Sequence, residues 1–334
     1  MAFKFEGVLE CSPRPEIDVE GNKLVSILIP TFNRERYLGI ALASATAQTY
    51  SNTEIVVVDN CSTDRSWEII EDFASRFDNL RAYRHNRNHG VSFNFMTTFE
   101  LARGYYHKWL MSDDALSINC VSVLVQMLEA QPSAILASSS RVPIDEDGKV
   151  LPNISATIPL VDSTGYYKGA SVIERVLVDG TNSIGEPTTA LYRVQDVNLE
   201  KYFRDGSRLR WIGDVDLWVD LLKRGDLAYA HIPLSFFRLH DGQDQKSASV
   251  EAALPEWLLL IQECWLEGVI SWEMAASAVA NQISFFASHL HYSDGEEKKR
   301  LLPLARFAFE VYEAVCSGRN VTAPLCPPEI PSFV

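Results

Sequence analysis

The chain has 334 residues, of which 47% are hydrophobic and 22% are charged, a balance typical of a globular protein with a sizeable core. Its formal net charge of −14 argues against a nucleic-acid partner, because phosphate binding needs a basic surface. No apolar stretch approaches the roughly 20 residues that a membrane-spanning helix needs, and the first residues lack the apolar core of a signal peptide. The six cysteines are scattered without metal-binding spacing, so we expect a cytoplasmic protein with reduced thiols.

Segments of strand character alternate with segments of helical period over the first 115 residues. The predicted strands cover 24–30, 54–59, 80–84 and 106–111. The predicted helices between them cover 34–48, 66–77 and 93–103. Alternation of this kind produces right-handed βαβ units, so we expect an α/β fold with a mostly parallel sheet flanked by helices.

The regular alternation stops after residue 115. The elements predicted beyond this point are a strand over 135–142, a hairpin-type turn at 145–148, a short helix at 169–178, a strand at 188–192, a helix at 214–222, strands over 228–238 broken by Pro233, and helices from 254 to about 316. This pattern predicts an irregular leader over 1–23, a main domain over 24–250 and a C-terminal helical region over 251–334.

Two adjacent carboxylates, Asp113 and Asp114, directly follow the apolar run 109–111 and Ser112. In an open α/β sheet the ligand crevice lies beyond the carboxyl ends of the strands. Two like charges held together are tolerated best when a cation or a hydrogen-bonding ligand completes the site. The alternative is a solvated turn in which an aspartate caps the next helix, and these residues alone do not decide between the two.

The first two predicted strands also end in polar residues. Pro30, Thr31 and Asn33 follow the first strand, and Asp59 closes the second. If the strands are parallel, both ends share one edge of the sheet, where Asp59 could accept a hydrogen bond from a nucleobase and polar main chain could hold a sugar. Helix capping is the alternative for Asn33. Asp59 is harder to explain in that way, because burying a carboxylate without a partner is costly.

Four further polar residues are ambiguous when each is taken alone. Asn88 precedes a predicted helix, and turn formation explains it as well as ligand contact does. Asp214 opens the predicted helix 214–222; the helix dipole stabilises an acid there, but a helix start that faces a cleft also suits a general base. Arg238 and His240 end a strand, where Arg238 suits a diphosphate and His240 suits a metal or a phosphate oxygen.

Taken together and in order, these segments resemble the family 2 glycosyltransferases, which have the GT-A fold and use nucleotide-activated sugars. The resemblance is carried by SILIPTFNR at 26–34, VVDNCSTD at 57–64, NHG at 88–90 and KWLMSDD at 108–114. It continues more thinly through 185–187, 213–218 and 238–240. It implies a GT-A-type (Rossmann-like) domain with a nucleotide-sugar half over 24–115 and an acceptor half over 116–250, followed by a C-terminal helical extension.

The resemblance also implies roles for individual residues. The residues that would bind the donor nucleotide or its sugar are Pro30, Thr31, Asn33, Asp59, Asn88, Asp113 and Arg238. Asp114 and His240 would hold a divalent cation, Mn²⁺ or Mg²⁺, and Asp214 would be the catalytic base. The chain departs from the family pattern at Ser112, where an acid is usual, and at Gly213, where many relatives have Glu.

The implied activity is inverting transfer of a hexose or deoxyhexose from a nucleoside diphosphate sugar to a hydroxyl of a glycan or lipid-linked acceptor, in bacterial surface polysaccharide or glycan synthesis. Two alternatives stay open: a binding subunit without turnover, and a sugar-1-phosphate nucleotidyltransferase. The latter should carry a glycine-rich loop with an arginine, where this chain has PTFN at 30–33. The sequence does not name the sugar, the base or the acceptor.

The C-terminal helices are expected to pack back onto the catalytic domain. A homodimer surface is one alternative for them. Peripheral contact with the inner face of a membrane is another, through the basic run 298–300, although a solvated charge run explains that segment more simply.

Overall fold

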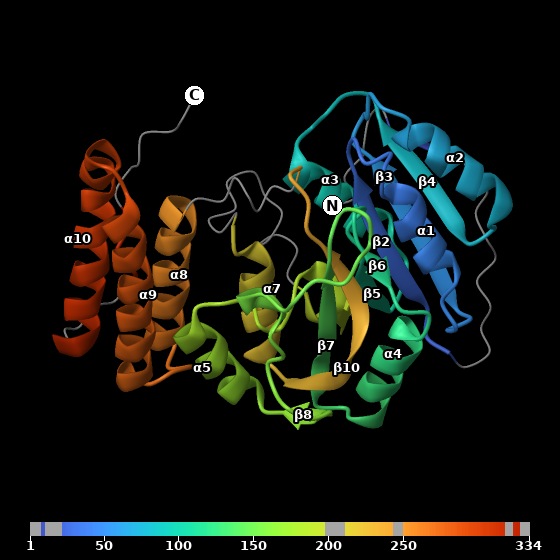
Figure 1. Ribbon diagram of the computed structural model, residues 1–334. Coiled ribbons are helices and arrows are strands. Elements are labelled where there is room, and N and C mark those ends of the chain that lie inside the picture. Colours follow the sequence, from blue (N-terminus) through green and yellow to red (C-terminus); the bar gives the residue numbers. More distant parts are fainter. Residues whose placement is uncertain (1–7, 11–21, 198–210, 243–249, 318–322, 328–334) are drawn as a thin grey trace. The chain divides into compact units, whose positions relative to one another are not determined.

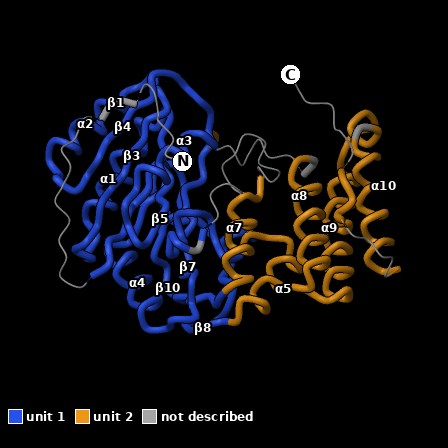
Figure 2. Tube along the Cα trace, turned by 180° about the vertical axis from the view of Figure 1, so that it is seen from behind, with its two compact units in different colours: residues 1–167, 183–207, 225–240 blue, residues 168–182, 208–224, 241–334 orange. Residues whose placement is uncertain are grey.

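The computed structural model of the protein describes residues 8–10, 22–197, 211–242, 250–317 and 323–327 (Figure 1). The chain forms two compact units, which Figure 2 shows in different colours. The first unit comprises residues 1–167, 183–207 and 225–240, and the second comprises 168–182, 208–224 and 241–334. The second unit thus combines the C-terminal helices with two segments from the middle of the chain. The predicted division at residue 250 follows chain order instead, and it remains a proposal.

The first unit is built on a sheet that has ten strands in the described part of the chain. The strands are β1 (Val8–Glu10), β2 (Val25–Thr31), β3 (Thr53–Asp59), β4 (Leu80–His85), β5 (Tyr106–Trp109), β6 (Ala115–Leu116), β7 (Ala134–Ile144), β8 (Gly165–Tyr167), β9 (Leu191–Arg193) and β10 (Asp226–Arg238). Their order is β1-β4-β3-β2-β5-β9-β7-β10-β6, with β8 also paired to β10. Most of the predicted leader lies outside the described residues; its residues 8–10 form β1, which pairs antiparallel with β4.

The strands β4, β3, β2 and β5 form the predicted parallel core. All residues of β2 are buried, which is why this strand reads as a continuous apolar run. The helices of this unit are α1 (Leu38–Thr46), α2 (Ser66–Arg76), α3 (Val91–Leu101) and α4 (Cys120–Ala130). Apolar side chains of α1, α2 and α4 join one buried cluster with the sheet. The α/β prediction therefore holds for this half of the sheet.

The remainder of the sheet is mixed, which the sequence did not predict. The short strand β9 runs antiparallel to both β5 and β7, and β7 runs parallel to β10. It follows that β5, β7 and β10 all point in the same direction. The predicted break at Pro233 is wrong, because β10 continues through it. The proline has no N–H to donate, and the ladder accommodates it with register shifts on either side.

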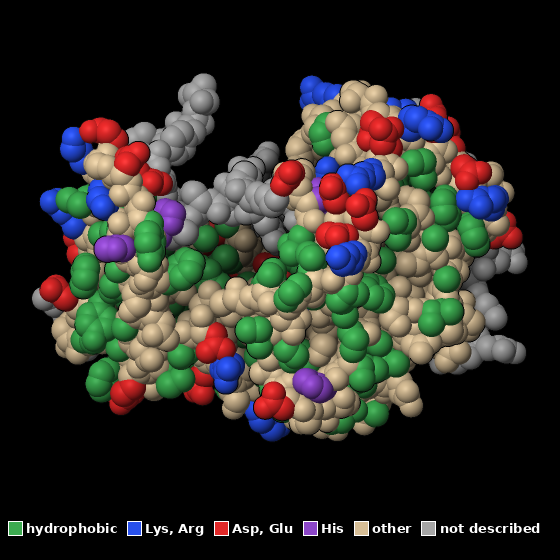
Figure 3. Space-filling model, in the orientation of Figure 1, with side chains coloured by type: hydrophobic (Ala, Val, Ile, Leu, Met, Phe, Trp, Pro, Cys, Tyr) green, Lys and Arg blue, Asp and Glu red, His purple; other side chains and the backbone are tan. Residues whose placement is uncertain are grey.

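The second unit is helical in its described part. Its helices are α5 (Gly169–Asp179), α7 (Gly213–Leu222), α8 (Val250–Leu266), α9 (Trp272–Tyr292) and α10 (Gly295–Ser317). The side chain of Asn281 in α9 donates a 2.9 Å hydrogen bond to the carbonyl of Val178 in α5. Figure 3 shows hydrophobic side chains exposed on the C-terminal helices. Phe285 and Tyr292 are among the exposed hydrophobic residues of α9. None of the helices in the described residues combines the length and apolar character needed to cross a membrane.

Candidate active site

The loops that follow β2 and β3 are joined by buried hydrogen bonds. The Asp59 carboxylate is fully buried and accepts hydrogen bonds from the amide (3.2 Å) and the hydroxyl of Ser62. The Ser62 hydroxyl in turn accepts a 2.8 Å hydrogen bond from the amide of Asn33. The Asn33 side chain accepts another from the amide of Thr63, also at 2.8 Å. Asn33 therefore connects the two loops, and its backbone is left-handed, with φ +49°.

Burial raises the pKa of Asp59, although the hydrogen bonds from Ser62 and the nearby charge of Arg84 act in the opposite direction. The Nε atom of Arg84 lies 3.1 Å from Asp59 Oδ2. The carboxylate thus has protein partners, as expected for a buried charge. Its predicted contact with a nucleobase stays a prediction.

The end of β2 lies beside the end of β3, so that Pro30 pairs with Val58 and Thr31 with Asp59. The Thr31 hydroxyl is buried and has no hydrogen-bond partner among the described residues. Asn88 is exposed, and its side-chain oxygen accepts a 2.8 Å hydrogen bond from the amide of Gly90. This contact is the one expected of a turn-forming asparagine.

Asp113 lies between two nitrogen-bearing side chains. Its Oδ2 atom is 3.0 Å from Nε2 of His240 and 3.4 Å from Nε of Arg34. The Asp113 side chain retains 13% exposure. The His240 ring also packs against Tyr37, with ring centroids 4.8 Å apart. A loop after β2, the end of β5 and the end of β10 therefore converge on this one carboxylate.

Asp114 has different surroundings from its neighbour. It is 2% exposed; its Oδ2 accepts a 2.6 Å hydrogen bond from the Thr188 hydroxyl, and its Oδ1 accepts one of 2.9 Å from the amide of Arg238. Burial, followed by the charge of Asp113, raises the pKa of Asp114 well above its ordinary value. Asp114 thus holds the surrounding backbone together, whereas the Asp113 side chain remains partly exposed to solvent.

The Arg238 side chain is buried and braces the backbone around this pair. Its Nε donates a 2.7 Å hydrogen bond to the carbonyl of Asp113, and its Nη1 donates one of 3.0 Å to the carbonyl of Asp145. The guanidinium also stacks over the Tyr37 ring at 4.9 Å. The predicted contact between Arg238 and a diphosphate stays a prediction, and the contacts seen here are structural.

Sequence reasoning assigned no role to Arg34 or Thr188, although both touch the carboxylate pair. Arg34 belongs to the first motif, so its position at the edge of the sheet was a usable signal. Thr188 had no comparable signal, because its place depends on the antiparallel strand β9 that follows it.

Asp113 and His240 form the pair best suited to hold a divalent cation, since they supply a carboxylate oxygen and an imidazole nitrogen 3.0 Å apart. Manganese accepts both donor types, whereas magnesium prefers oxygen. In the described part of the chain no group of three or more His, Cys, Asp or Glu side chains is arranged to hold a metal ion. The residues present therefore fit a cation only if a bound ligand contributes further oxygen atoms.

Asp214 belongs to the second unit and is the second residue of α7. Its Oδ2 accepts a 2.7 Å hydrogen bond from the side chain of Asn182, and its Oδ1 accepts one of 2.8 Å from the amide of Val215. These bonds fix the orientation of the carboxylate. Its predicted role as a catalytic base stays a prediction.

A carboxylate from α8 caps the start of α7. Glu256 Oε2 accepts hydrogen bonds from the amides of Trp211 at 2.7 Å and Ile212 at 3.0 Å. Glu256 is buried, so these contacts satisfy amides at the helix start that would otherwise lack partners. An acid thus sits close to Gly213 in the structure, although it comes from a distant part of the sequence.

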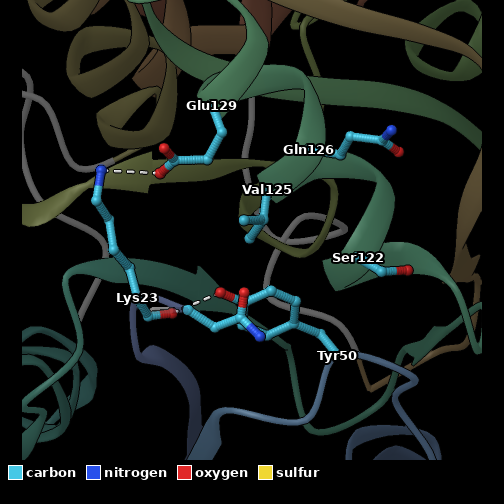
Figure 4. A pocket seen from close by; sticks show the side chains of 7 residues that line it. Lys23, Tyr50, Ser122, Val125, Gln126 and Glu129 are labelled. Carbon is cyan, nitrogen blue, oxygen red and sulfur yellow. Dashed lines mark hydrogen bonds and ion pairs between the residues drawn. The ribbon is translucent and has the colours of Figure 1, made fainter. Parts of the chain in front are cut away.

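A cavity of about 260 Å³ lies between helix α4 and the residues that precede β2 and β3 (Figure 4). It is lined by Asn22, Lys23, Tyr50, Ser122, Val125, Gln126 and Glu129. A 2.9 Å ion pair joins Lys23 to Glu129, and the Tyr50 hydroxyl donates to the carbonyl of Lys23 at 2.7 Å. The cavity includes none of the predicted site residues, and its charged groups already pair with each other.

Comparison with known proteins places these motifs in context. The sequence model for the family described as Glycosyl transferase family 2 matches residues 26–198. An uncharacterised glycosyltransferase of Rickettsia bellii is 27% identical over 275 residues, which cover 81% of this chain and 38% of that protein. A putative colanic acid biosynthesis glycosyl transferase, WcaA of Escherichia coli K12, is 35% identical over 109 residues. These residues cover 32% of this chain and 38% of that protein. The matched segment thus covers well under half the length of each of these two relatives.

Among solved structures, residues 1–349 of TarS from S. aureus, in complex with UDP-GlcNAc, superpose with a TM-score of 0.62. The alignment covers 89% of this chain and 92% of that one, at 16% sequence identity. Identity this low shows a shared fold and nothing further. The predicted GT-A-type α/β fold with additional C-terminal helices is confirmed.

Proposed function

Because the chain belongs to glycosyl transferase family 2, we propose that it is an inverting glycosyltransferase that uses a nucleoside diphosphate sugar. The acceptor is a hydroxyl of a glycan or lipid-linked saccharide, and the sugar transferred is a hexose or deoxyhexose. The observation that carries the proposal is the convergence of Asp113, Asp114, Arg34 and His240 at the carboxyl edge of the sheet, where such sheets bind ligands. The relative named for colanic acid biosynthesis supports a role in bacterial polysaccharide synthesis.

The nucleoside half of the donor is proposed to bind where β2 and β3 end. Asp59 and the Thr31 hydroxyl, which has no hydrogen-bond partner among the described residues, are the polar groups proposed to contact the base and the ribose. The backbone of Asn33 is held rigidly by Ser62 and can line the pocket without reordering. Rigid loops of this kind reduce the entropy lost when a ligand binds.

The diphosphate is proposed to lie next to Asp113, with Arg34 and His240 on either side. A divalent cation, Mn²⁺ or Mg²⁺, would be held there by Asp113, His240 and diphosphate oxygens, and when bound it neutralises charge on the departing diphosphate. The family resemblance implied Asp114 and His240 as the cation ligands. The burial of Asp114 and its two hydrogen bonds favour Asp113 in place of Asp114, with Asp114 as the residue that fixes the loop.

The chemical step is proposed to be a single displacement at the anomeric carbon. The acceptor oxygen forms a bond to this carbon as the bond from the carbon to the diphosphate oxygen breaks, and Asp214 takes the acceptor's proton. Asn182 donates to Asp214 Oδ2 and thereby orients the carboxylate for this transfer. Arg34 lies beside Asp113 and offers a positive charge to the leaving group.

A donor panel tests this function. UDP-, GDP- and dTDP-sugars are incubated with the full chain and Mn²⁺, and nucleoside diphosphate release and thermal shift are both recorded. We expect at least one donor to raise the melting temperature and to release its diphosphate when an acceptor is present. If no nucleotide sugar gives either response, the function is wrong. Binding without release would instead support a binding subunit.

The variant Asp214→Asn tests the proposed base. Loss of a general base lowers turnover by about 10²- to 10⁴-fold, whereas donor affinity should remain. Asp220→Asn is the matched control, because Asp220 lies on the same helix and pairs with Arg224 at the surface. Normal turnover by Asp214→Asn would show that another group takes the proton.

A further inference from the structure

A short turn before β9 lies directly against the carboxylate pair. The 3₁₀ turn η2 (Pro187–Thr189) precedes β9, which pairs antiparallel with β5 and β7. Leu191 is opposite Lys108 on one side and Ala137 on the other. Residues just before an antiparallel strand lie at the carboxyl edge of its neighbours, so the turn is brought to the edge where Asp113 and Asp114 are found.

Thr188 in this turn makes two side-chain contacts with that edge. Its hydroxyl donates a 2.6 Å hydrogen bond to Asp114 Oδ2 and accepts one of 3.1 Å from the amide of Met111. One side chain therefore holds both the carboxylate and the backbone that leads into it. On its other oxygen, the same carboxylate accepts from the amide of Arg238, two residues before His240.

Lys108 fixes the turn from within the sheet. Its side chain is 0% exposed, and its ammonium donates to the carbonyl of Thr188. Lysine is almost never fully buried without a partner, and the proposed reaction assigns no role to Lys108. The contact gives it a structural purpose, since it locks the backbone of Thr188.

Two further contacts hold the residues before the turn. Nε of Arg141 lies 2.6 Å from the Glu186 carboxylate, and the pair is buried. The Ser138 hydroxyl donates a 2.6 Å hydrogen bond to the carbonyl of Ile184. Gly185 lies between Ile184 and Glu186 and has φ +123°. A Cβ at this position would lie 2.0 Å from the hydroxyl oxygen of Thr189, so a larger residue would clash there. The turn is thus anchored to β7 as well as to β5.

We propose that Thr188 is a positioning residue for the Asp113–Asp114 pair and that Lys108 holds Thr188 in place. Through Asp114 and the Arg238 amide, this arrangement sets the distance between the ends of β5 and β10 and hence the spacing of Asp113 from His240. The proposal rests on the proposed function for its catalytic consequence. Its structural part stands independently of that function.

Thr188→Val is the main variant, because it keeps the side-chain shape and removes the hydroxyl. Thr189→Val is the matched control: Thr189 is equally buried, but its hydroxyl donates to the carbonyl of Glu186 and does not touch Asp114. Thr188→Ser restores the hydroxyl, and Lys108→Met removes the ammonium. Loss of an outer partner of a metal or catalytic ligand typically lowers affinity or activity by about 10- to 100-fold.

Two measurements separate this proposal from the proposed function. Hydrogen exchange at the Arg238 amide needs no activity; we expect it to accelerate in Thr188→Val and in Lys108→Met, and to remain slow in Thr189→Val and Thr188→Ser. With a donor found in the panel, we expect Thr188→Val to lower kcat and raise the Mn²⁺ concentration for half-maximal turnover, with little change in the KM for donor.

Each result supports or overturns a defined part of the proposal. Unchanged exchange at the Arg238 amide in Thr188→Val overturns the positioning role, whether or not any donor is active. Equal kinetics in Thr188→Val and Thr189→Val overturns its catalytic consequence. Normal exchange in Lys108→Met overturns the role of Lys108 alone. If the wild-type chain responds to no nucleotide sugar, the proposed function is refuted. The positioning role of Thr188 is then tested by the hydrogen-exchange result alone.

Discussion

Acid should destabilise the fold through a buried histidine that has no part in the proposed chemistry. His107 is buried in β5, where its ring packs edge-on against Phe99 with centroids 4.4 Å apart. Its Nδ1 has no hydrogen-bond partner among the described residues. Burial lowers the pKa of His107 to about 3 from the ordinary value of 6.5. The folded protein therefore resists protonation of this ring, whereas the unfolded chain accepts it.

The sign and size of the effect follow from these two pKa values. Because the folded-state pKa is the lower one, the stabilising contribution of neutral His107 is complete above pH 6.5 and is lost as pH falls toward 3. One pKa unit corresponds to about 1.4 kcal/mol, so the roughly 1.5 units between pH 6.5 and pH 5 correspond to about 2 kcal/mol. His107→Phe removes this dependence. Any packing cost of the larger ring that does not depend on pH cancels when the unfolding free energies of one protein at two pH values are subtracted.

The assay is urea denaturation at pH 8 and at pH 5. We expect the loss of unfolding free energy between these two pH values to be about 2 kcal/mol smaller in His107→Phe than in the wild type. His291→Gln is the control, because His291 is exposed on α9 and should leave the loss unchanged. Equal losses in His107→Phe and the wild type would refute the reasoning, since they would mean that the ring titrates alike in the folded and unfolded states.

Two further outcomes are expected. In the first unit, Glu54 is buried beside Arg81 at 3.0 Å and also accepts a 2.6 Å hydrogen bond from the amide of Arg103. Glu54→Gln should lower the unfolding free energy by about 3–5 kcal/mol, because it leaves the arginine charge uncompensated; a loss below about 1 kcal/mol, the range of exposed pairs, would contradict this. At the site, His240→Ala should raise the Mn²⁺ concentration for half-maximal activity by at least about 10-fold, because loss of even an outer partner of a ligand typically costs about 10- to 100-fold. An unchanged requirement would remove His240 from the proposed cation site.

The first half of the fold was predictable because its signals are local. Each strand of the parallel core is buried on both faces, and continuous apolar runs such as 24–30 and 54–59 result. The polar residue that ends each run marks the carboxyl edge. For this reason the position of Asp59 and Asp113 at this edge could be predicted from the sequence.

The rest depends on contacts between distant segments. A strand as short as β9 has no periodicity that could reveal its direction, so the position of Thr188 could not be foreseen. Arg238 was predicted to bind a diphosphate because arginine suits one, but nothing local indicated that its guanidinium would be buried against backbone carbonyls. The different burial of Asp113 and Asp114 likewise depends on β10, which returns to this edge more than a hundred residues later.

The return of β10 to the edge that carries Asp113 and Asp114 has a consequence for the order in which the site assembles. The contacts of Asp113 with His240 and of Asp114 with the Arg238 amide span 127 and 124 positions of the chain. The family-matched segment 26–198 contains both aspartates but neither of these partners. During synthesis the carboxylate pair therefore emerges without them, and the cluster around it closes only when β10 docks beside β7. A fragment ending at residue 198 would display the family motifs without a completed site.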